Sequence, residues 1–307
     1  MEAIVAQDIV RVHKTGRGID SLTFSIPPGQ CIGILGPNGS GKTTLTRLVA
    51  GLDRIQHGRL LVLGELANPR SRHLRRCCGV ALEMPAHWDA LTGRQNLCFF
   101  GRQYGLSGSD LNERMQTLLS EAGLDAQADD PVDTYSFGMR RKLGIIEAII
   151  SDPELLVLDE PSAGADSDFL ERLFVWVRSR CERGLTTWLA DNDADWLARA
   201  ATHLILLADG KIRIQGDVRE LTASIAPRQR IELILEQPCS DVFAPPTIAE
   251  VYSYHCEDRR IMAEVSGNGD ISVELIKWIN SCGGRVRSMN VRSVTLYEAL
   301  TQREAES

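Results

Sequence analysis

The segment "GPNGSGKTT", Gly36 to Thr44, has the residue types and spacing to bind a chain of phosphates. It matches G-x-x-x-x-G-K-[ST], in which glycines let the backbone curl so that successive N–H groups face phosphate oxygens. The apolar run 31–35 precedes it and a helical pattern follows, so a helix N-terminus adds favourable partial charge. Lys42 can reach the β- and γ-phosphates, and the Thr43 hydroxyl can ligate Mg²⁺. We predict nucleotide contacts at Gly36, Pro37, Asn38, Gly39, Ser40, Gly41, Lys42, Thr43 and Thr44.

A second candidate site is "LLVLDEP", Leu155 to Pro161, an apolar run that ends in two acidic residues. Asp159 lies where a nucleotide-binding sheet places the carboxylate that holds Mg²⁺, directly or through water. Glu160 beside it can orient or deprotonate an attacking water. A strand followed by an acidic turn is common, so this segment gains its meaning from the phosphate loop.

Between these motifs, "YSFGMRRKLG" (135–144) predicts a helix that begins at a Ser and a Gly and carries Arg140, Arg141 and Lys142. Its N-terminus is a second candidate anion site, because a helix N-terminus favours negative charge. Taken alone, the segment is equally typical of an N-capped basic helix.

The segment "TTWLADND" (186–193) ends an apolar run in Asp191, Asn192 and Asp193. Three polar side chains at a strand exit are compatible with a metal nest, a helix cap or part of a catalytic face. Residues 194–201 have a helical pattern, for which Asn or Asp is a suitable cap. We expect a metal nest least, because Asp191 and Asp193 diverge on leaving a strand.

The elements that must position these residues alternate along the chain. Apolar runs at 31–35, 78–83, 153–160, 185–190 and 202–210 predict buried strands separated by helices, which indicates an α/β protein with a parallel sheet. Alternating runs at 3–12 and 21–26, and the run 59–64, predict further strands. Residues 92–130 predict helices without a strand. After residue 221 the pattern is a linker leading to a strand, then strand, helix, strand and helix, which predicts a small α/β appendage.

Composition narrows the class of protein. Hydrophobic residues make up 43% and charged residues 24%, as in ordinary globular proteins. The net charge of -7 disfavours a general nucleic-acid binder, which needs a basic face. Eight cysteines without a C-x-x-C pair predict reduced thiols rather than a disulfide framework. No secretory signal is evident, and no apolar run approaches the ~20 residues of a bilayer span. Work at a membrane would therefore require another polypeptide to supply the span.

The order of phosphate loop, helical insertion, "YSFGM" and "LLVLDEP" resembles the ATP-binding cassette (ABC) ATPases of membrane transporters over residues 3–220. "PSAGAD" (161–166) resembles their D-loop. The resemblance implies an α/β fold: a parallel P-loop sheet with an antiparallel β subdomain and a helical subdomain at about 84–150. It also implies two cassettes pairing head to tail around two ATP and Mg²⁺. The nucleotide of one cassette would be contacted by residues of the other, here Ser136, Phe137, Gly138, Met139 and Asp166.

Several positions depart from the family pattern. Phe137 and Met139 replace a Gly and a Gln of the signature, and Thr15 stands near the usual adenine-stacking aromatic, with His13 as a possible substitute. Glu83 aligns with a glutamine; it can still ligate Mg²⁺, but it adds negative charge. Asn192 aligns with a histidine that contacts the γ-phosphate. Asn can donate a neutral hydrogen bond but cannot carry positive charge, so we expect slow turnover or dependence on a partner.

The resemblance gives a division into residues 1–221, an ABC ATP-binding domain, and 222–307, an accessory or dimerisation domain. Glu160, Asn192 and Lys42 are the expected catalytic residues, and Thr43, Asp159 and Glu83 the expected metal ligands. The expected partners are a second cassette and an integral membrane permease at the cytoplasmic face of the cell membrane, with no nucleic acid. Residues after 221, which include "SVTLYEALTQRE", resemble the C-terminal extension of ATPases that serve drug, lipid, polysaccharide or cofactor-maturation exporters with separate type-2 permease chains, and this resemblance favours export over import. A soluble non-transport cassette and a regulatory cassette with negligible hydrolysis remain alternatives. The permease would contact the region 83–104, in which Trp88, Phe99, Phe100 and Tyr104 cluster, although each is also compatible with core packing.

Overall fold

The computed structural model describes residues 2–84, 87–223, 228–238, 248, 251–266, 271–294 and 298–300. The chain divides into two compact units, Met1–Arg219 and Glu220–Ser307, close to the boundary predicted at residue 221. Each unit has its own buried apolar cluster. The nucleotide motifs all lie in the first unit.

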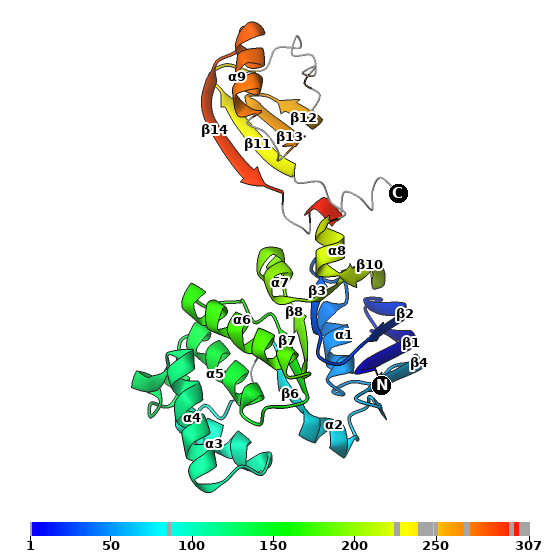
Figure 1. The fold of residues 1–307 in the computed structure, drawn as a ribbon, viewed down its shortest axis with the longest axis vertical. Coiled ribbons are helices and arrows are strands. Elements are labelled where there is room, and N and C mark those ends of the chain that lie inside the picture. The colour runs from blue at the N-terminus through cyan, green and yellow to red at the C-terminus, as the bar shows by residue number, and fades with distance from the viewer. Residues whose placement is uncertain are drawn as a thin grey trace. The chain divides into compact units, whose positions relative to one another are not determined.

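A six-stranded sheet forms the centre of the first unit, in the order β10-β9-β3-β8-β7-β6 (Figure 1). In that order the strands are Lys211–Asp217, His203–Ala208, Cys31–Leu35, Thr186–Ala190, Leu155–Asp159 and Cys78–Ala81. All neighbours are parallel except β10, which is antiparallel to β9. Every residue of β3, β7 and β8 is buried, as expected for parallel strands covered on both faces. The carboxyl ends of these three neighbours therefore carry the candidate motifs at one edge of the sheet.

A smaller antiparallel sheet lies in the same unit, in the order β2-β1-β4-β5 (Figure 1). Its strands are β1 (Ile4–Val12), β2 (Gly18–Ile26), β4 (His57–Val62) and β5 (Glu65–Leu66). Its apolar residues share one core cluster with β3 and the helix α1 (Lys42–Val49), so the sheet is fixed to the element that begins at the phosphate loop. The predicted combination of a parallel sheet and an antiparallel β subdomain is confirmed.

Helices complete the first unit. Those outside the helical insertion are α1, α2 (Arg72–Cys77), α6 (Ser167–Glu182) and α7 (Ala194–Ala200), and α8 (Val218–Ala223) spans the boundary between the two units. The insertion between β6 and β7 contains α3 (Gly93–Gln103), α4 (Gly108–Ala122), the short 3₁₀ segments η1 (Asp125–Gln127) and η2 (Val132–Thr134), and α5 (Phe137–Ile149). The three long helices pack against one another, and the described residues between 87 and 149 contain no strand. α5 also packs against β6 and β7, which ties the insertion to the sheet.

The second unit contains one antiparallel sheet, β12-β13-β11-β14, with the helix α9 (Ser272–Ser281) packed on it. The strands are β11 (Arg228–Leu235), β12 (Val251–Glu257), β13 (Arg260–Ser266) and β14 (Val286–Ser293). The core joins alternate residues of β11 to one face of α9. The sequence analysis did not predict β12. Of the helix predicted near the end of the chain, residues 298–300 are helical, and the rest lies outside the described residues.

Two sequence expectations concern membranes and thiols. Within the described part of the chain, no helix is both long enough and apolar enough to cross a bilayer. Cys31, Cys77, Cys78, Cys98, Cys181 and Cys282 are free thiols. Cys256 is disulfide-bonded, so the expectation of reduced cysteines is wrong at this residue.

Candidate active site

The phosphate loop connects the end of β3 to the start of α1. α1 begins at Lys42, and its N-cap Gly41 has a φ of 107°, a left-handed conformation that glycine adopts without steric cost. A Cβ at Gly41 would lie 2.7 Å from the carbonyl oxygen of Gly18, so a side chain would also push the β1–β2 hairpin away. The sequence thus turns directly from a buried strand into a helix whose N-terminus faces a cavity.

Lys42 is the cation of the loop. Its Nζ donates hydrogen bonds to the carbonyl oxygens of Gly36, at 2.7 Å, and Pro37, at 3.2 Å. Burial lowers the pKa of Lys42, and the nearby carboxylates of Glu160 and Asp159 oppose this shift. Lys42 is therefore a buried ammonium group poised at the loop, with acidic groups on the facing strand.

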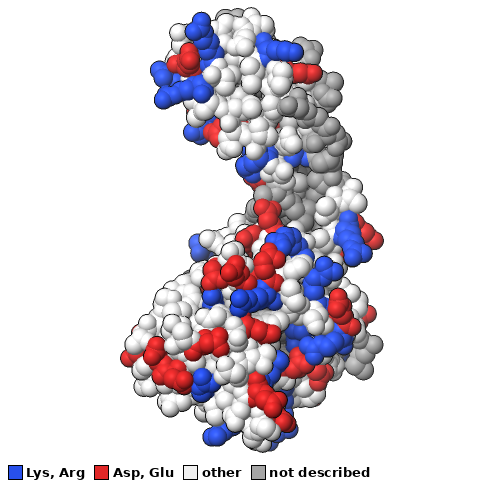
Figure 2. Space-filling view, turned by 60° about the vertical axis from the view of Figure 1, so that its left-hand side comes forward, with Lys and Arg blue, Asp and Glu red and all other residues white. Residues whose placement is uncertain are grey.

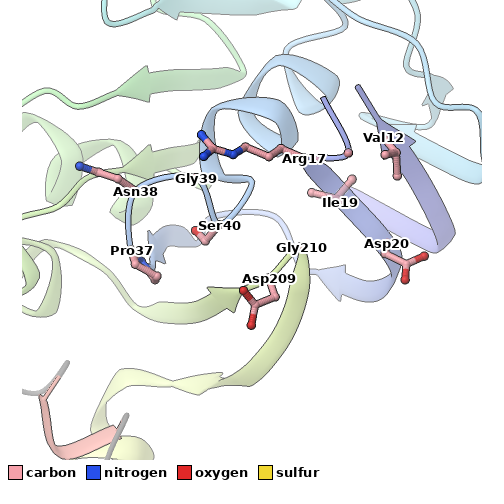
Figure 3. A pocket seen from close by; sticks show the side chains of 12 residues that line it. Val12, Arg17, Ile19, Asp20, Pro37, Asn38, Gly39, Ser40, Asp209 and Gly210 are labelled. Atoms are coloured by element: carbon pink, nitrogen blue, oxygen red, sulfur yellow. The ribbon is translucent and has the colours of Figure 1, made fainter. Parts of the chain in front are cut away.

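A cavity of about 510 Å³ brings most of the predicted residues together. The predicted residues that line it are Asn38, Gly39, Gly41, Lys42, Thr43, Thr44, Glu83, Glu160 and Asn192. Pro37 and Ser40 line a neighbouring cavity of about 370 Å³ that shares Asn38 and Gly39 with the larger one (Figure 3). The residues that share the larger cavity come from β3–α1, from the segment after β6 and from the ends of β7 and β8, as the parallel topology requires.

Asp159, the last residue of β7, has the environment of a cation ligand. Both of its carboxylate oxygens are buried and accept no hydrogen bond of good geometry from the described residues, although the Thr43 hydroxyl lies close enough to act on them. Burial raises the pKa of Asp159 to about 6, while the neighbouring Thr43 hydroxyl opposes the shift. A buried carboxylate without a donor is costly unless a cation or another donor satisfies it. Asp159 and Thr43 therefore fit Mg²⁺, as their chemistry predicts.

Glu160 follows Asp159 and has an unusual backbone conformation. Its φ is 53°, which is uncommon for a residue with a side chain. Its N–H donates to the carbonyl oxygen of Ala190 at 2.6 Å, and its own carbonyl oxygen accepts from Nε of Arg141 at 3.2 Å. These bonds from β8 and α5 hold the turn, which directs the carboxylate of Glu160 into the cavity.

Asn192 lies opposite Glu160. Its amide Nδ2 donates a hydrogen bond of 2.8 Å to Oε1 of Glu160. An ionised carboxylate only accepts hydrogen bonds, so the NH₂ group of the amide must face it. The structure thus pairs Asn192 with the carboxylate predicted to activate water.

The neighbours of Asn192 settle the alternatives left open for this segment. Asp193 is the N-cap of α7 and accepts from the backbone N–H of Trp196, so Asn192 is not the cap. Asp191 is buried and accepts from the N–H and hydroxyl of Ser162 and from the N–H of Asp193. The carboxylates of Asp191 and Asp193 serve as local acceptors rather than as a metal nest. Within the described residues, no group of three or more His, Cys, Asp and Glu side chains is placed to hold a metal.

The predicted signature residues do not reach this cavity. Ser136 caps α5 and accepts from the N–H of Met139 at 3.3 Å, whereas Phe137 is 61% exposed. Gly138 contacts the D-loop, because a Cβ there would lie 2.4 Å from the carbonyl oxygen of Gly164. These residues present a helix N-terminus at the surface of the chain.

The basic residues of α5 form contacts with other segments of the same chain. Arg141 is buried and donates to the carbonyl oxygens of Leu82, Asp159 and Glu160. Lys142 pairs with Asp166, which also caps α6 by accepting from the N–H of Phe169. Asp166 is therefore engaged within its own chain.

Arg140 completes this set by pairing with Asp89 at 2.8 Å. The sequence analysis placed Arg141 on this helix without a role, and the structure shows that its guanidinium binds backbone carbonyl oxygens beside the candidate site. Spacing along α5 could not show this, since the acceptors come from other segments.

The remaining contacts of the cavity involve the β1–β2 hairpin. Nε2 of His13 lies 3.1 Å from the Thr44 hydroxyl, at the start of α1. Thr15 lines the same cavity. Arg17 lines both cavities and was not singled out from the sequence, where it is one cation among 34 lysines and arginines. Its position next to two glycines in "TGRGID" was the available signal.

A phosphate loop, a magnesium-compatible aspartate and a carboxylate aimed at the same cavity define a P-loop nucleotide hydrolase. A family model described as ABC transporter matches residues 19–163. Nod factor export ATP-binding protein I of Sinorhizobium fredii is 36% identical over 236 residues, covering 70% of this chain and 69% of that protein. The protein of the same name from Cupriavidus metallidurans is 32% identical over 263 residues, covering 82% and 86%.

Solved structures show the same fold. One described as the ATP-binding subunit of an ABC transporter aligns with a TM-score of 0.67 and 22% identity, over 72% of this chain and 92% of that one. A dimeric ATP-binding cassette in a post-hydrolysis state, bound to ADP and phosphate, aligns with a TM-score of 0.63 and 20% identity, over 70% and 99%. The chain belongs to the ABC transporter family and is one of its ATP-binding ATPase cassettes.

Proposed function

We propose that this cassette hydrolyses ATP to drive an exporter whose membrane permease is a separate chain. The observation that carries the proposal is the single cavity in which Lys42, Thr43, Glu160 and Asn192 converge beside the buried Asp159. Relatives named as export ATP-binding proteins support the direction of transport.

Each residue would have a distinct role in hydrolysis. Lys42 and the loop N–H groups would hold the β- and γ-phosphates. Thr43 and Asp159, with Glu83 at the cavity wall, would hold Mg²⁺, which neutralises charge on the phosphate oxygens. Glu160 would accept a proton from the attacking water. Asn192 would orient the Glu160 carboxylate through the 2.8 Å hydrogen bond and donate to the γ-phosphate when its amide is free to do so.

This arrangement supports slow turnover. A neutral amide bound to Glu160 supplies orientation but no positive charge at the γ-phosphate. Loss of one preorganised donor at a reaction centre typically costs roughly 10²–10³ in rate. We therefore expect Asn192→His to raise kcat for ATP hydrolysis by about tenfold or more, because an imidazole restores a donor that can be charged. Phosphate release measured on the purified chain with its permease tests this.

The matched variants are Asn192→Ala, which removes the donor, and Glu160→Gln, which removes the base. We expect Asn192→Ala to lower kcat and Glu160→Gln to abolish hydrolysis while ATP still binds. An unchanged rate in Asn192→His would contradict the slow-turnover proposal. A wild-type rate equal to that of Glu160→Gln would instead favour the alternative of a regulatory cassette without hydrolysis.

A second surface supports the permease proposal. A cavity of about 220 Å³ is lined largely by apolar residues, which are Leu52, Val80, Ala81, Leu82, Met84, Phe100, Tyr104 and Ala148, together with Gly144 and Glu147. Trp88 is 56% exposed and contacts Phe99 edge-on, at 5.9 Å between ring centroids. Tyr104 has a packing role as well, since its hydroxyl donates to the carbonyl oxygen of Cys78 at 3.3 Å.

We propose that a permease helix binds this surface at the cytoplasmic face of the membrane, and that two cassettes pair around two ATP. The second unit would help the pair to form or regulate it. Copurification of the tagged chain with a polytopic membrane protein tests the permease proposal. If Met84→Asp abolishes this copurification while ATP binding is retained, the permease contacts the surface around Met84. A soluble chain that copurifies with ribosomes or DNA would contradict the proposal. In the view of Figure 2, Lys and Arg are interspersed with Asp and Glu over the described residues, which does not favour a nucleic-acid interface on the side shown.

A further inference from the structure

The β1–β2 hairpin aims one cation at the phosphate loop. The Arg17 side chain extends from the hairpin toward the loop, and its Nη1 lies 3.8 Å from the position that a Cβ on Gly39 would occupy (Figure 3). The hairpin is closed by hydrogen bonds from the N–H of His13 to the carbonyl of Arg17, at 2.7 Å, and from the N–H of Gly16 to the carbonyl of His13, at 2.9 Å. Its geometry therefore fixes where Arg17 leaves the backbone.

The glycine after Arg17 cannot be replaced without moving this hairpin. A Cβ on Gly18 would lie 1.9 Å from the carbonyl oxygen of Arg11, and the φ of Gly18 is 149°. On the other side of the hairpin, His13 contacts the Thr44 hydroxyl at 3.1 Å. The hairpin thus meets the nucleotide loop at two points, with His13 at the start of α1 and Arg17 over Gly39.

Arg17 has no partner among the described residues. Its side chain is exposed, and it forms no ion pair or side-chain hydrogen bond within the part of the chain that the structure describes. Other arginines of the first unit are engaged, for example Arg140 with Asp89 and Arg199 with Glu171. A guanidinium held over a loop of phosphate-facing N–H groups therefore keeps its donors available for a ligand.

The cavity beneath Arg17 is lined by both positive and negative side chains. Among the residues that line it, Lys42 and Arg17 are the cations, and Glu83 and Glu160 are the anions. Asp159 adds a further carboxylate next to Thr43. Lys42 alone would leave the acidic groups in excess at the place where a polyphosphate must bind. Arg17 adds a second positive charge to the lining of this cavity, which also contains Glu83.

We propose that Arg17 binds the phosphate chain of the nucleotide within its own cassette, as a second cation of the phosphate loop. The inference rests on nucleotide binding at this cavity and assigns Arg17 a part in it. The guanidinium can form two parallel hydrogen bonds to phosphate oxygens, which a lysine cannot. The β1–β2 hairpin is then a phosphate-binding element as well as a neighbour of the base.

Calorimetric titration of the full chain without Mg²⁺ tests this, with ATP and inorganic tripolyphosphate as separate probes. We expect Arg17→Ala to weaken both probes by a similar factor, about tenfold, the value of one charge-assisted hydrogen bond. Arg17→Lys should give an affinity between those of the wild type and Arg17→Ala, because it keeps the charge but cannot form both hydrogen bonds. Lys14→Ala is the matched control: Lys14 is an exposed cation on the same hairpin that lines neither cavity, so affinity should stay at the wild-type value.

Equal tripolyphosphate affinities in wild type and Arg17→Ala would overturn the proposal. Weaker ATP binding with unchanged tripolyphosphate binding would also overturn it, since Arg17 would then contact the base or ribose. Failure of the nucleotide site itself has a different signature, because the wild-type chain would bind neither probe. Circular dichroism of each variant verifies that the exposed substitution leaves the fold intact.

Discussion

At the scale of single residues, the cost in stability of burying the Asp159 carboxylate can be measured directly. Its buried carboxylate lacks a hydrogen-bond donor of good geometry among the described residues, and burial raises its pKa to about 6. At pH 8 without Mg²⁺ the group is charged in both the folded and the unfolded chain, and the folded state carries the penalty. We expect Asp159→Asn to raise the free energy of unfolding by roughly 1–3 kcal/mol under these conditions. Denaturant unfolding with chelator present measures this.

The control for Asp159→Asn is addition of Mg²⁺ and ATP. We expect the two ligands to stabilise the wild-type chain and to stabilise the variant far less, since binding to the native state alone shifts the unfolding equilibrium. A variant that is less stable than wild type without Mg²⁺ would show that Asp159 has partners that satisfy its charge.

Residues within one continuous motif could be predicted from sequence, and residues that act across segments could not. Lys42 and Asp159 belong to patterns whose spacing reports their chemistry. The pairing of Asn192 with Glu160 joins the ends of β8 and β7 and depends on the order of strands in the sheet. Arg141 carries no local signal, because any arginine inside a helix looks the same in sequence. The glycines on either side of Arg17 indicate a turn, but they do not show that the turn lies over the phosphate loop.

At the scale of elements, a buried ion pair joins the segment after β6 to the helix α5. Nδ1 of His87 lies 3.1 Å from Glu147, and Nε2 lies 2.8 Å from the carbonyl oxygen of Arg140. Acceptors at both nitrogens favour the protonated imidazole, because a neutral ring has only one N–H. Burial raises the pKa of Glu147, which the hydrogen bond from His87 opposes. Burial lowers the pKa of His87, but the Glu147 carboxylate and the carbonyl outweigh it, so the pKa is raised above 6.5.

The sign of the pH dependence follows from this raised pKa. The stabilisation is fully present below the unfolded value of about 6.5 and is lost as pH rises through the higher folded value. We expect the unfolding free energy of the wild-type chain to fall over this range, and the double variant His87→Gln/Glu147→Gln to lack that component. The exposed His57→Gln serves as control and should keep the wild-type slope. Identical slopes in wild type and the double variant would contradict the pair's charge.

Arg141 makes a second connection from α5, to the ends of β6 and β7. Its guanidinium satisfies the carbonyl oxygens of Leu82, Asp159 and Glu160. We expect Arg141→Met to lower the free energy of unfolding by roughly 3–5 kcal/mol, because buried carbonyls lose their donors. Arg199→Met, which breaks the exposed pair with Glu171, should change it by less than about 1 kcal/mol. Urea unfolding of both variants measures the difference, and equal effects would refute a structural role for Arg141.

Helices and strands could be predicted where the apolar residues follow one clear pattern along the chain. The fully buried runs of β3, β7 and β8 gave an unambiguous signal. In the second unit, β12 has mostly exposed and partly buried residues, so its sequence lacks the alternation that marks a strand. β12 is a strand because its backbone pairs with β13, and the residue pattern of β12 alone does not predict this pairing.

At the scale of the whole molecule, each of the two units has its own hydrophobic core. The apolar cluster of the first unit includes β3, β7 and α1, and that of the second joins β11 and β13 to α9. We expect residues 1–223, which include all of α8, to fold alone and to bind ATP with the affinity of the full chain. Calorimetric unfolding of the full chain should show two transitions, and the truncated chain should retain the one that ATP shifts.

The contrary result is equally clear for this truncation. A truncated chain that fails to bind ATP but keeps the circular dichroism of a folded cassette would make the second unit part of the nucleotide site. A single transition in the full chain, shifted as a whole by ATP, would show that the two cores unfold as one cooperative unit.

The guanidinium of Arg141 has a further consequence for motion. It fastens α5 to the backbone of Glu160 and to the segment that leaves β6 at Leu82. The helical insertion therefore cannot move independently of the sheet: if α5 rotates, the turn at Glu160 must move with it or these hydrogen bonds must break. A displacement of the surface around Met84 would therefore be transmitted through the Arg141 side chain to the turn that carries the Glu160 carboxylate.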